Sequence, residues 1–500
     1  MKILLINPAL TGNLSAGIGT IKVPLGLAYI AAYLEKHGDG VEIIDCLAYY
    51  DNVEEIEKGI FRIGLSEEKL AERIKKANPG IIGISCAYTS YERDSFRTAE
   101  IVKKICPKSL VVFGGAHCSA NPERVLKNKN VDVVVLGEGE ITFLNIVKSY
   151  EKNGKMGKIN GIAYKEKGKI KINPTREYIE NLDEIPFPAR HLLPMERYLK
   201  HPQNSIANMR KPTTEIVSSR GCPFSCIFCS IHTVWGKKWR ARSAGNVVDE
   251  IEMLSNKYGI REFRFFDDNI SWDKKRIIEI CDEIIKRNLN IKWDTPNGVA
   301  ISTLNEEVLK KMKQAGYYKA VFGIESGNEE TLKKIRKPLS VKYAKKIVRL
   351  ANKIGIWTWS TFVIGFPWET KEDIKKTIDF IKNSDLDFIT VYIAQPYPGT
   401  EMYSLYEKEG LLESGIDMQS TVANTKYNTK YFKAEELREL QKRVYMEFFK
   451  SKIRGYANPI KFYDKFLSKI RTLEDLWYVA RMFLNLIGKE YSPIYKTSEK

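Results

Sequence analysis

The chain has 500 residues, of which 43% are hydrophobic and 28% are charged, so it can bury sizeable cores in about three domains. This composition excludes a disordered or collagen-like chain, and eight cysteines are too few for a secreted disulfide scaffold. Lys and Arg outnumber Asp and Glu by 80 to 62. Because no nucleic-acid-binding module or dense basic block accompanies this surplus, we favour a charged, thermophile-like surface and expect no nucleic-acid partner.

The sequence gives no sign of a targeting or membrane-spanning segment. Its first apolar run, Met1–Ile6, is too short for a signal peptide. Its best apolar stretch, Val23–Leu34, is shorter than the roughly 20 residues of a membrane span. We therefore expect a cytoplasmic protein in a reducing compartment, without a transmembrane segment.

Residues 1–150 alternate short β-branched runs with helical patterns, which predicts a doubly wound parallel sheet of the α/β class. Strands are expected at Lys2–Ile6, Val41–Asp45, Ile81–Ser85, Leu110–Phe113 and Val131–Leu136. Helices are expected at Leu25–His37, Ser66–Asn78, Tyr91–Cys106 and Glu123–Asn128. Ligands of such sheets bind at the carboxyl ends of strands, and glycines interrupt the chain after two of these ends, at Gly114, Gly115, Gly137 and Gly139.

Residues 151–210 are expected to form a hairpin, Ile159–Ile172, and a proline-rich connector, Leu182–Pro188. Residues 211–410 carry six strand–helix repeats, which predicts a partial (β/α)6 barrel. Its strands are expected at Glu215–Ser218, Glu262–Phe266, Ile291–Thr295, Lys319–Gly323, Thr358–Gly365 and Phe388–Ala394. Residues 411–500 are expected to be helical, most clearly at Glu435–Ser451 and Leu473–Ile487.

Three cysteines, Cys222, Cys226 and Cys229, lie together directly after the first strand of the predicted barrel. Thiolates bind soft metals, and three of them leave one iron of a four-iron cluster without a protein ligand, as chemistry at a cluster requires. The alternative is a structural zinc ion on these cysteines and His232. The three-residue gap between the first two cysteines is unusual for zinc, and no second ligand pair follows.

At these residues the sequence resembles the radical S-adenosylmethionine (SAM) superfamily, whose motif is Cys-x-x-x-Cys-x-aromatic-Cys, with Phe228 in the aromatic place. The resemblance implies a 4Fe-4S cluster on the three cysteines, with SAM bound to the fourth iron. It implies that an electron from the reduced cluster cleaves SAM to a 5′-deoxyadenosyl radical, which abstracts hydrogen from an unactivated carbon. A low-potential donor such as ferredoxin or flavodoxin is expected to supply that electron.

The same resemblance assigns SAM contacts to later strands of the barrel. The family's Gly-Gly-Glu stretch is replaced by Phe266–Asn269, where Asp267 or Asp268 is expected either to accept from the SAM amine or to cap the next helix. Glu325 ends the fourth strand and is expected near the SAM ribose or amine. Gly365 lies in a segment that resembles the one contacting adenine.

A doubly wound domain ahead of such a barrel resembles the cobalamin-binding class of the superfamily. Ser85, Gly114 and Gly115 have the spacing of the residues that line the nucleotide tail of cobalamin in that class. Gly137 and Gly139 lie in a second matching segment. Glycine suits this place because a bulky ligand must approach the backbone closely. The resemblance therefore implies cobalamin as a third cofactor.

Two alternatives stay open for this domain. Asn7–Val23 contains no histidine, so the lower cobalt face is expected to lack a histidine ligand, or the domain keeps the fold and has lost the cofactor. In addition, Cys46, Cys86 and Cys118 lie near strand ends, where methylthiotransferases of the superfamily hold an auxiliary cluster. Ordinary packing of buried cysteines explains the same three positions.

Residues 214–251 most specifically resemble the branch that contains the anaerobic magnesium-protoporphyrin IX monomethyl ester oxidative cyclase and the hopanoid methylases. That branch implies a small-molecule substrate, of lipid or tetrapyrrole-like kind. It includes methyl transfer to unactivated carbon, which consumes two SAM molecules per turnover, and oxidation or cyclisation. We favour methyl transfer, with an oxidative cyclase as the alternative.

The last segment, Arg443–Ile487, interleaves Lys and Arg with aromatic residues. These are Tyr445, Phe448, Phe449, Phe462, Phe466, Trp477 and Phe483. Basic aromatic helices can lie on an anionic membrane, but they more often pack over the mouth of a barrel. We favour packing and keep peripheral membrane contact as the alternative.

Overall fold

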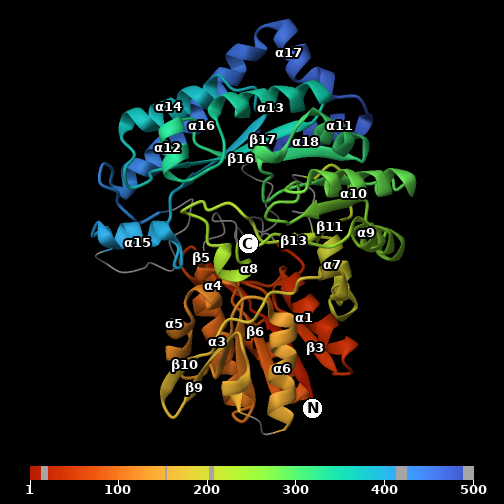
Figure 1. Cartoon of the computed structure of the whole chain (residues 1–500), viewed down its shortest axis with the longest axis vertical. Helices are drawn as coiled ribbons and strands as arrows, with labels where there is room; N and C mark the ends of the chain where they lie inside the picture. The colour runs from red at the N-terminus through yellow and green to blue at the C-terminus, as the bar shows by residue number, and fades with distance from the viewer. Residues whose placement is uncertain (13–20, 153–154, 202–207, 413–424, 488–500) are drawn as a thin grey trace. The chain divides into compact units, whose positions relative to one another are not determined.

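The computed structural model describes residues 1–12, 21–152, 155–201, 208–412 and 425–487 (Figure 1). The chain divides into two compact units. Unit 1 comprises Met1–Asn204, Ser230–Gly236 and Gly488–Lys500, and unit 2 comprises Ser205–Cys229 and Lys237–Ile487. The cysteine motif lies at the end of the first stretch of unit 2.

Unit 1 is built on a seven-stranded sheet in the order β10-β9-β8-β7-β6-β1-β3. Its strands are β1 Ile3–Asn7, β3 Val41–Asp45, β6 Ile81–Ser85, β7 Leu110–Gly114, β8 Val133–Val135, β9 Ile162–Glu166 and β10 Lys169–Ile172. The first five run parallel, whereas β9 pairs antiparallel with β8 and β10 with β9. The parallel part confirms the predicted doubly wound sheet, and the predicted hairpin extends its edge.

Alternate residues of each strand point to opposite faces of this sheet, and both sets are apolar. Helices therefore cover both faces. Leu4 and Ile6 belong to one apolar core, whereas Ile3 and Leu5 belong to the other. The helices of unit 1 are α1 Leu25–Lys36, α2 Glu67–Ala77, α3 Glu92–Ile105, α4 Ala116–Ala120, α5 Pro122–Lys127, α6 Gly139–Glu151, α7 Met195–Leu199 and α8 His232–Trp235. Buried residues of α2, α3 and α5 pack into the first core, and those of α1 and α6 into the second.

A second, three-stranded antiparallel sheet in unit 1 was not expected from the sequence. It has the order β2-β5-β4, with β2 Leu10–Gly12, β4 Val53–Glu57 and β5 Ile60–Ile63. Four of the five residues of β4 are exposed, so the strand carries charged residues instead of the apolar run that marks a buried strand. Gly59, at φ 76°, makes the tight turn between β4 and β5.

Unit 2 contains a six-stranded parallel sheet in the order β11-β14-β15-β16-β17-β18. Its strands are β11 Thr213–Ile216, β14 Glu262–Phe265, β15 Lys292–Asp294, β16 Tyr317–Glu325, β17 Trp357–Ile364 and β18 Phe388–Ile393. Two further short strands, β12 Ser219–Arg220 and β13 Arg240–Ala241, pair beside it. The helices are α9 Ala244–Tyr258, α10 Lys274–Lys286, α11 Glu306–Gln314, α12 Glu329–Lys334, α13 Val341–Ile354, α14 Lys371–Lys382 and α15 Glu401–Lys408. Six parallel strands in chain order, joined by helices, confirm the predicted partial barrel.

Three helices follow the barrel: α16 Ala434–Tyr456, α17 Pro459–Lys465 and α18 Leu473–Ile487. An open sheet leaves the backbone groups of its last strand unpaired, and α16 supplies partners for one residue of β18. The Tyr445 hydroxyl accepts from the Val391 N–H at 2.9 Å, and Gln441 donates to the Val391 carbonyl at 2.6 Å. The helical tail therefore covers an edge of the barrel sheet.

Charged residues form a buried row across four strands of the barrel. Neighbouring strands place Glu215 beside Arg264, Arg264 beside Asp294, and Asp294 beside Lys319. Lys319 Nζ lies 2.7 Å from Asp294 Oδ2, and the two side chains are 3% and 0% exposed. Removing one partner of a buried pair leaves the other charge unpaired away from water, which is strongly destabilising.

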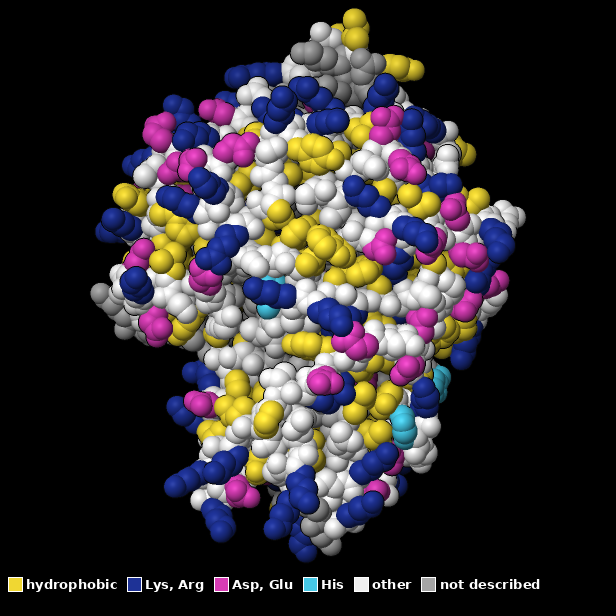
Figure 2. All heavy atoms as spheres, in the orientation of Figure 1, with side chains coloured by type: hydrophobic (Ala, Val, Ile, Leu, Met, Phe, Trp, Pro, Cys, Tyr) yellow, Lys and Arg dark blue, Asp and Glu magenta, His cyan; other side chains and the backbone are white. Residues whose placement is uncertain are grey.

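Charged side chains are spread over the face of the molecule that is drawn in Figure 2. On the face that Figure 2 presents, Lys and Arg side chains alternate with Asp and Glu and do not gather in one dense basic area. Within the described ranges, no helix is long and apolar enough to cross a membrane.

The buried row gives a first prediction. Lys319→Met should lower the free energy of unfolding by about 2 kcal/mol, because the buried Asp294 then keeps only Arg264, 3.5 Å away, as a cationic partner. The matched control is Lys310→Met, which removes a surface pair with Glu306 and should cost less than about 1 kcal/mol. Urea unfolding followed by tryptophan fluorescence measures both values. Equal midpoints for the two variants would contradict the assignment.

Candidate functional site

The three motif cysteines lie on one irregular segment, Cys222–Cys229, which we call the cysteine loop. It follows β11 and β12, so it lies beyond the carboxyl end of the first barrel strand. The Cys229 N–H donates to the Cys226 carbonyl at 3.1 Å, which folds the loop into a turn. None of the three cysteines is in a disulfide, and all three are partly exposed. This is the part of a barrel where functional residues gather.

Other elements of unit 2 hold the cysteine loop through its backbone. The Ile227 N–H donates to the Ile335 carbonyl at 3.3 Å, and the Met402 N–H donates to the Ile227 carbonyl at 3.0 Å. The ring of Phe228 packs 6.1 Å from the ring of Phe366, centre to centre, in an apolar cluster. The aromatic residue of the motif therefore anchors the loop.

The thiols have the chemistry of cluster ligands. Burial raises the pKa of Cys222 to about 11, and burial also raises the pKa of Cys226. An isolated thiolate is thus disfavoured here, and bound iron would supply the positive charge that stabilises it. Throughout the residues with assigned positions, no three or more His, Cys, Asp or Glu side chains surround a point that could hold one metal ion.

The two acids after the second strand brace the start of the cysteine loop. Asp267 accepts from the Ser218 N–H at 2.8 Å and from the hydroxyls of Ser218 and Ser219 at 2.6 and 2.5 Å. Asp268 accepts only one described hydrogen bond, from the Gly221 N–H at 3.2 Å. Burial, followed by repulsion from Asp267, raises the pKa of Asp268 to about 7.

The alternative role of these acids as a helix cap is wrong. Asp273, not Asp267 or Asp268, is the N-cap of α10, and its side chain accepts from the backbone of Lys275 and Arg276. The capping residue lies five positions beyond the nearer acid. Asp267 uses its acceptor capacity within the protein, whereas Asp268 keeps capacity for a ligand.

Glu325 ends β16 in a left-handed conformation, at φ 67°, which costs a non-glycine residue strain energy. Its carboxylate lies 3.0 Å from Lys337 Nζ and accepts from the Thr361 hydroxyl at 3.1 Å. A Cβ on Gly323 would lie 2.8 Å from Glu325 Oε1, so glycine makes room for the ion pair. Both charged side chains are nearly buried.

Lys337 is a candidate site residue that the sequence did not reveal. Burial lowers its pKa, but Glu325, Cys226 and Cys229 outweigh this effect and raise the pKa above its usual value. Its neighbour Arg336 presents a backbone carbonyl 3.9 Å from the Cys226 sulfur. The structure therefore places a permanent positive charge beside the cysteine loop. A lysine three residues after a short helix has no local sequence signal that distinguishes it from a surface lysine.

Gly365 begins the turn after β17 at φ 81°, a conformation that favours glycine. Its N–H donates to Glu369 Oε2 at 2.8 Å, and the same oxygen accepts from the Phe366 N–H at 3.2 Å. A Cβ at Gly365 would lie 2.7 Å from Leu437 Cδ2. Burial raises the pKa of Glu369 to about 7. The turn is fixed by the protein itself.

In unit 1, the predicted cobalamin residues gather at the carboxyl edge of the sheet. Ser85 and Gly114 are paired in register at the ends of β6 and β7. A Cβ at Gly114 would meet nothing closer than Val135 Cβ at 3.9 Å, so the space beside it is open. A Cβ at Gly115, at φ 126°, would lie 2.5 Å from the Cys86 carbonyl oxygen. This glycine edge fits a bulky ligand that approaches the backbone.

The two glycines of the second segment, Gly137 and Gly139, have different roles. The Gly137 N–H donates to the Ser119 hydroxyl at 2.9 Å, and its φ is 71°. Gly139 is the first residue of α6, and a Cβ there would lie 2.8 Å from Ile30 Cδ1. Gly137 thus lies at the sheet edge, whereas Gly139 serves the packing of α6 on α1.

The histidine nearest to this edge in sequence is already engaged. His117 is buried, with Nε2 2.8 Å from Glu92 Oε2 and Nδ1 3.2 Å from the Thr89 hydroxyl. Arg124 also donates to Glu92, at 2.8 Å. Both ring nitrogens of His117 therefore have partners within the protein.

Three of the four cysteines of unit 1 are buried packing residues. Cys46, Cys86 and Cys118 are all 0% exposed and belong to one apolar core. Burial raises the pKa of Cys46 to about 12 and raises the pKa of Cys118 as well. These are the properties of inert thiols, so the structure gives no support to an auxiliary cluster.

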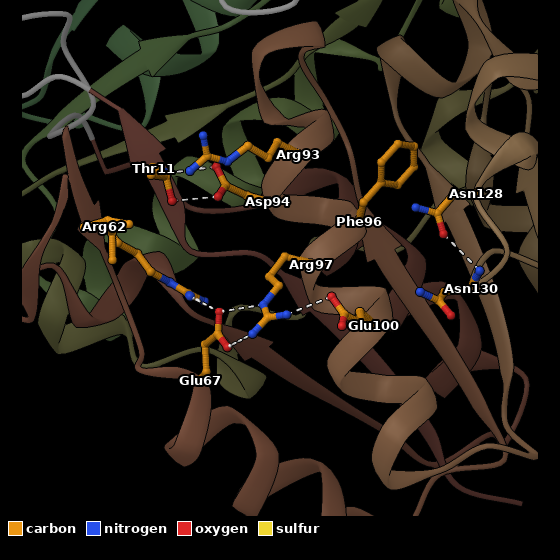
Figure 3. Close-up of a pocket in the computed structure, with 11 residues that line it drawn as sticks. Thr11, Arg62, Glu67, Arg93, Asp94, Phe96, Arg97, Glu100, Asn128 and Asn130 are labelled. Atoms are coloured by element: carbon orange, nitrogen blue, oxygen red, sulfur yellow. Dashed lines mark hydrogen bonds and ion pairs between the residues drawn. The ribbon is translucent and has the colours of Figure 1, made fainter.

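A polar cavity of about 430 Å³ lies elsewhere in unit 1 (Figure 3). Glu67 lies between Arg62 and Arg97, and Arg97 also reaches Glu100 at 2.8 Å. Asp94 accepts from the Thr11 hydroxyl at 2.7 Å. Most of the charged groups in this cavity are paired with one another. They join the three-stranded sheet to α2 and α3 and do not select a ligand of one charge.

Comparison with known proteins identifies two domain families in this chain. The sequence profile of the radical SAM superfamily matches residues 216–381, and that of the B12 binding domain matches residues 14–147. The chain is 36% identical to an uncharacterized methyltransferase of Pyrococcus horikoshii, over 90% of this chain and 92% of the relative. It is 30% identical to the cytidylyl-2-hydroxyethylphosphonate methyltransferase of Streptomyces wedmorensis, over 91% of each chain.

One further relative belongs to the predicted branch of the superfamily, and one solved structure shares the fold. The chain is 30% identical to the anaerobic magnesium-protoporphyrin IX monomethyl ester cyclase of Rubrivivax gelatinosus, over 81% of this chain and 69% of the relative. The structure of the radical SAM methyltransferase TsrM from Kitasatospora setae, with cobalamin and a [4Fe-4S] cluster bound, matches with a TM-score of 0.66 at 18% identity. That match covers 83% of this chain and 78% of TsrM and shows a shared fold. The chain therefore belongs to the cobalamin-binding radical SAM family, whose cofactors are a 4Fe-4S cluster, SAM and cobalamin.

Proposed function

We propose that this protein is a methyltransferase that adds a methyl group to an unactivated carbon of a small molecule. The observation that carries the proposal is the cysteine loop, which presents three thiols outside any disulfide at the carboxyl end of the barrel sheet. The glycine edge of unit 1 belongs to the same chain and fits cobalamin. Two relatives that align with about nine-tenths of the chain carry methyltransferase names, which supports methyl transfer.

In this proposal Cys222, Cys226 and Cys229 hold the cluster, and Phe228 keeps their loop anchored. The bound cluster and SAM supply one-electron chemistry that generates a carbon radical on the substrate. Asp268 has spare acceptor capacity for the SAM amine, and Asp267 braces the loop. Glu325, held by Lys337 and Thr361, faces SAM from the end of the fourth strand. Gly365 contacts adenine through a turn that Glu369 fixes.

In unit 1, Ser85, Gly114 and Gly115 line the cobalamin tail, and Gly137 extends the same edge. Bound cobalamin supplies a transferable methyl group. Gly139 acts through the packing of α6. The second candidate function is an oxidative cyclase with the same cofactors, favoured by the identity to the magnesium-protoporphyrin ester cyclase. A lipid or tetrapyrrole-like substrate, a ferredoxin- or flavodoxin-like electron donor and a reducing cytoplasm complete the proposal.

The two reactions differ in what they consume. The cofactor-loaded protein is incubated with a low-potential reductant, SAM carrying a trideuterated methyl group, and lipid or tetrapyrrole extracts. Methyl transfer predicts equal amounts of 5′-deoxyadenosine and S-adenosylhomocysteine, with a mass increase of the trideuteromethyl group on one acceptor. Formation of 5′-deoxyadenosine with an unmethylated, oxidised product would replace the proposal by the cyclase.

The cluster assignment predicts the effect of removing its ligands. Substitution of Cys222, Cys226 and Cys229 by alanine should reduce bound iron from about four per chain to almost none and abolish 5′-deoxyadenosine formation. The control is Cys106→Ala, which changes a half-buried cysteine of unit 1. It should leave the iron content and the formation of 5′-deoxyadenosine unchanged. Iron analysis and chromatography of the nucleoside provide the readouts. Full nucleoside production by the triple variant would disprove the assignment.

The ion pair between Lys337 and Glu325 predicts that substitutions of its two members change the reduction of the cluster in opposite directions. Reduction adds negative charge, so the positive charge of Lys337 favours it and the negative charge of Glu325 opposes it. At a fixed potential near the midpoint, Lys337→Met should lower the ratio of reduced to oxidised cluster about tenfold, which is about 59 mV for one electron. Glu325→Gln should raise the ratio.

Electron paramagnetic resonance during a redox titration measures this ratio independently of turnover. Lys333→Met, at an exposed position on α12, is the control and should not change it. Shifts of the same sign for Lys337→Met and Glu325→Gln would contradict the electrostatic role of the pair.

The glycine edge predicts that adjacent glycines respond differently. Gly114→Ala should fold normally, because its Cβ meets open space, yet bind cobalamin about tenfold more weakly since the methyl group occupies the edge. Gly115→Ala should be destabilised by at least about 1 kcal/mol, because its φ is 126° and its Cβ would collide with the Cys86 carbonyl. Thermal melting and the absorbance of bound cobalamin separate the two effects. Unchanged cobalamin affinity in Gly114→Ala would place the ligand elsewhere.

A further inference from the structure

Large apolar side chains are concentrated on the surface of the three C-terminal helices. Of the sixteen such side chains exposed in the described residues, nine lie between residues 446 and 477. We call these nine the C-terminal apolar surface: Met446, Phe449, Ile453, Ile460, Tyr463, Leu467, Leu473, Leu476 and Trp477. Leu473, Ile460 and Ile453 are 72–75% exposed, and Trp477 is 66% exposed. Figure 2 shows hydrophobic side chains protruding over α17, at the top of the view.

The nine residues follow helical spacing within each helix. On α16, Met446, Phe449 and Ile453 are three and four positions apart and form one stripe. On α18, Leu473, Leu476 and Trp477 are likewise spaced by three and four positions. Each helix thus presents an apolar stripe to solvent, in addition to the stripe that it buries.

The opposite stripes are fixed by contacts within unit 2, so the exposed residues cannot be buried by rotating the helices. On α16, Gln441 and Tyr445 bond the edge strand β18. On α18, Tyr478 is 0% exposed, and its ring lies 5.9 Å from that of Trp357. Rotation of either helix would break these contacts in order to cover the outer stripe.

A row of aromatic contacts holds the three helices together. The ring of Tyr456, at the end of α16, lies 5.4 Å from that of Phe462 on α17. Phe462 stacks on Phe466 at 5.4 Å, and Phe466 lies 5.7 Å from Trp357, which also contacts Tyr478 on α18. The helices therefore form one assembly that carries the outer stripes.

Positive charges accompany the apolar stripe of α16. Lys450, Lys452 and Arg454 lie between or next to Phe449 and Ile453, and Glu447 is the single acid of the same stretch. Glu447 lies 3.2 Å from Lys382 and 3.6 Å from Lys450, so cations remain in excess around this stripe. A second copy of this chain would bring like charges together, whereas anionic headgroups would neutralise them. Trp477 and Tyr463 are residue types that favour the boundary between headgroups and acyl chains.

We propose that the C-terminal apolar surface binds the face of a bilayer that contains anionic phospholipid. The apolar stripes would enter the acyl boundary, and the cations of α16 would contact headgroup phosphates. Such binding is peripheral and needs no spanning helix. It is independent of the reaction proposed above, because none of these residues belongs to the cysteine loop or the glycine edge.

The test is flotation of the full-length, cluster-loaded protein with vesicles. We expect binding to vesicles of phosphatidylcholine with 30% phosphatidylglycerol, and at least tenfold weaker binding to phosphatidylcholine alone or at high salt. The double variant Ile453→Ser/Trp477→Ser should lose at least tenfold in affinity for the anionic vesicles. Ile285→Ser is the matched control, since Ile285 is an exposed apolar residue of α10 in the same unit, and it should bind like the unchanged protein.

Circular dichroism and iron content establish that each variant is folded. Absence of vesicle binding by the unchanged protein, or equal binding by the double variant, would overturn the proposal. Light scattering tests the alternative that the surface binds a second copy of the chain. That alternative would be correct if the unchanged protein is a dimer that does not bind vesicles and the double variant is a monomer. Retained 5′-deoxyadenosine formation in a double variant that no longer binds vesicles would show that surface and reaction are separate.

Discussion

The proposed cluster site depends on how the barrel holds the cysteine loop, which carries three thiols within eight residues. A short irregular segment has little structure of its own, and isolated thiolates at half-buried positions are unfavourable. Here Asp267 and Asp268 hold the approach to the loop, while Ile335 and Met402 hold its middle through the backbone. These contacts come from several separate segments of unit 2. The proposed ligand set is therefore assembled only when the barrel is folded.

Electrostatics around the loop follow from the same placement. Burial alone would favour neutral groups, and it does raise the pKa of Cys222, Asp268 and Glu369. Lys337 is the exception, because Glu325 and the nearby thiols keep it charged. A buried cation beside the ligands would ease the binding of electron-rich sulfur and the uptake of an electron. The barrel thus supplies charge as well as geometry.

Local patterns were sufficient to predict the repeating parts of the fold. Buried β-branched runs predicted the parallel strands of both units, and the spacing of Cys222, Cys226 and Cys229 identified the motif directly. The three-stranded sheet of unit 1 was missed because its exposed strand β4 has no apolar run. The cap of α10 was misplaced because three aspartates lie within seven residues, and only tertiary contacts show which one faces the helix.

Contacts between distant segments also decide the roles that sequence left open. Lys337 and Glu325 are twelve residues apart and meet only because a strand and a following turn place them together. The cysteines of unit 1 are near strand ends, as expected, but they point into the apolar core, which no spacing rule reveals. In the C-terminal helices, one face packs on the barrel and another is exposed. Tyr445 covers the edge of the barrel sheet, whereas Trp477 is exposed to solvent.

The central claim is that one chain carries both a three-cysteine cluster and cobalamin. Its most direct test is the stoichiometry of iron, sulfide, zinc and cobalamin in protein purified without oxygen, reconstituted, and expressed with hydroxocobalamin. The account predicts about four irons, about four sulfides and one cobalamin per chain. One zinc per chain without sulfide would contradict the cluster, and about eight irons without cobalamin would contradict the assignment of unit 1.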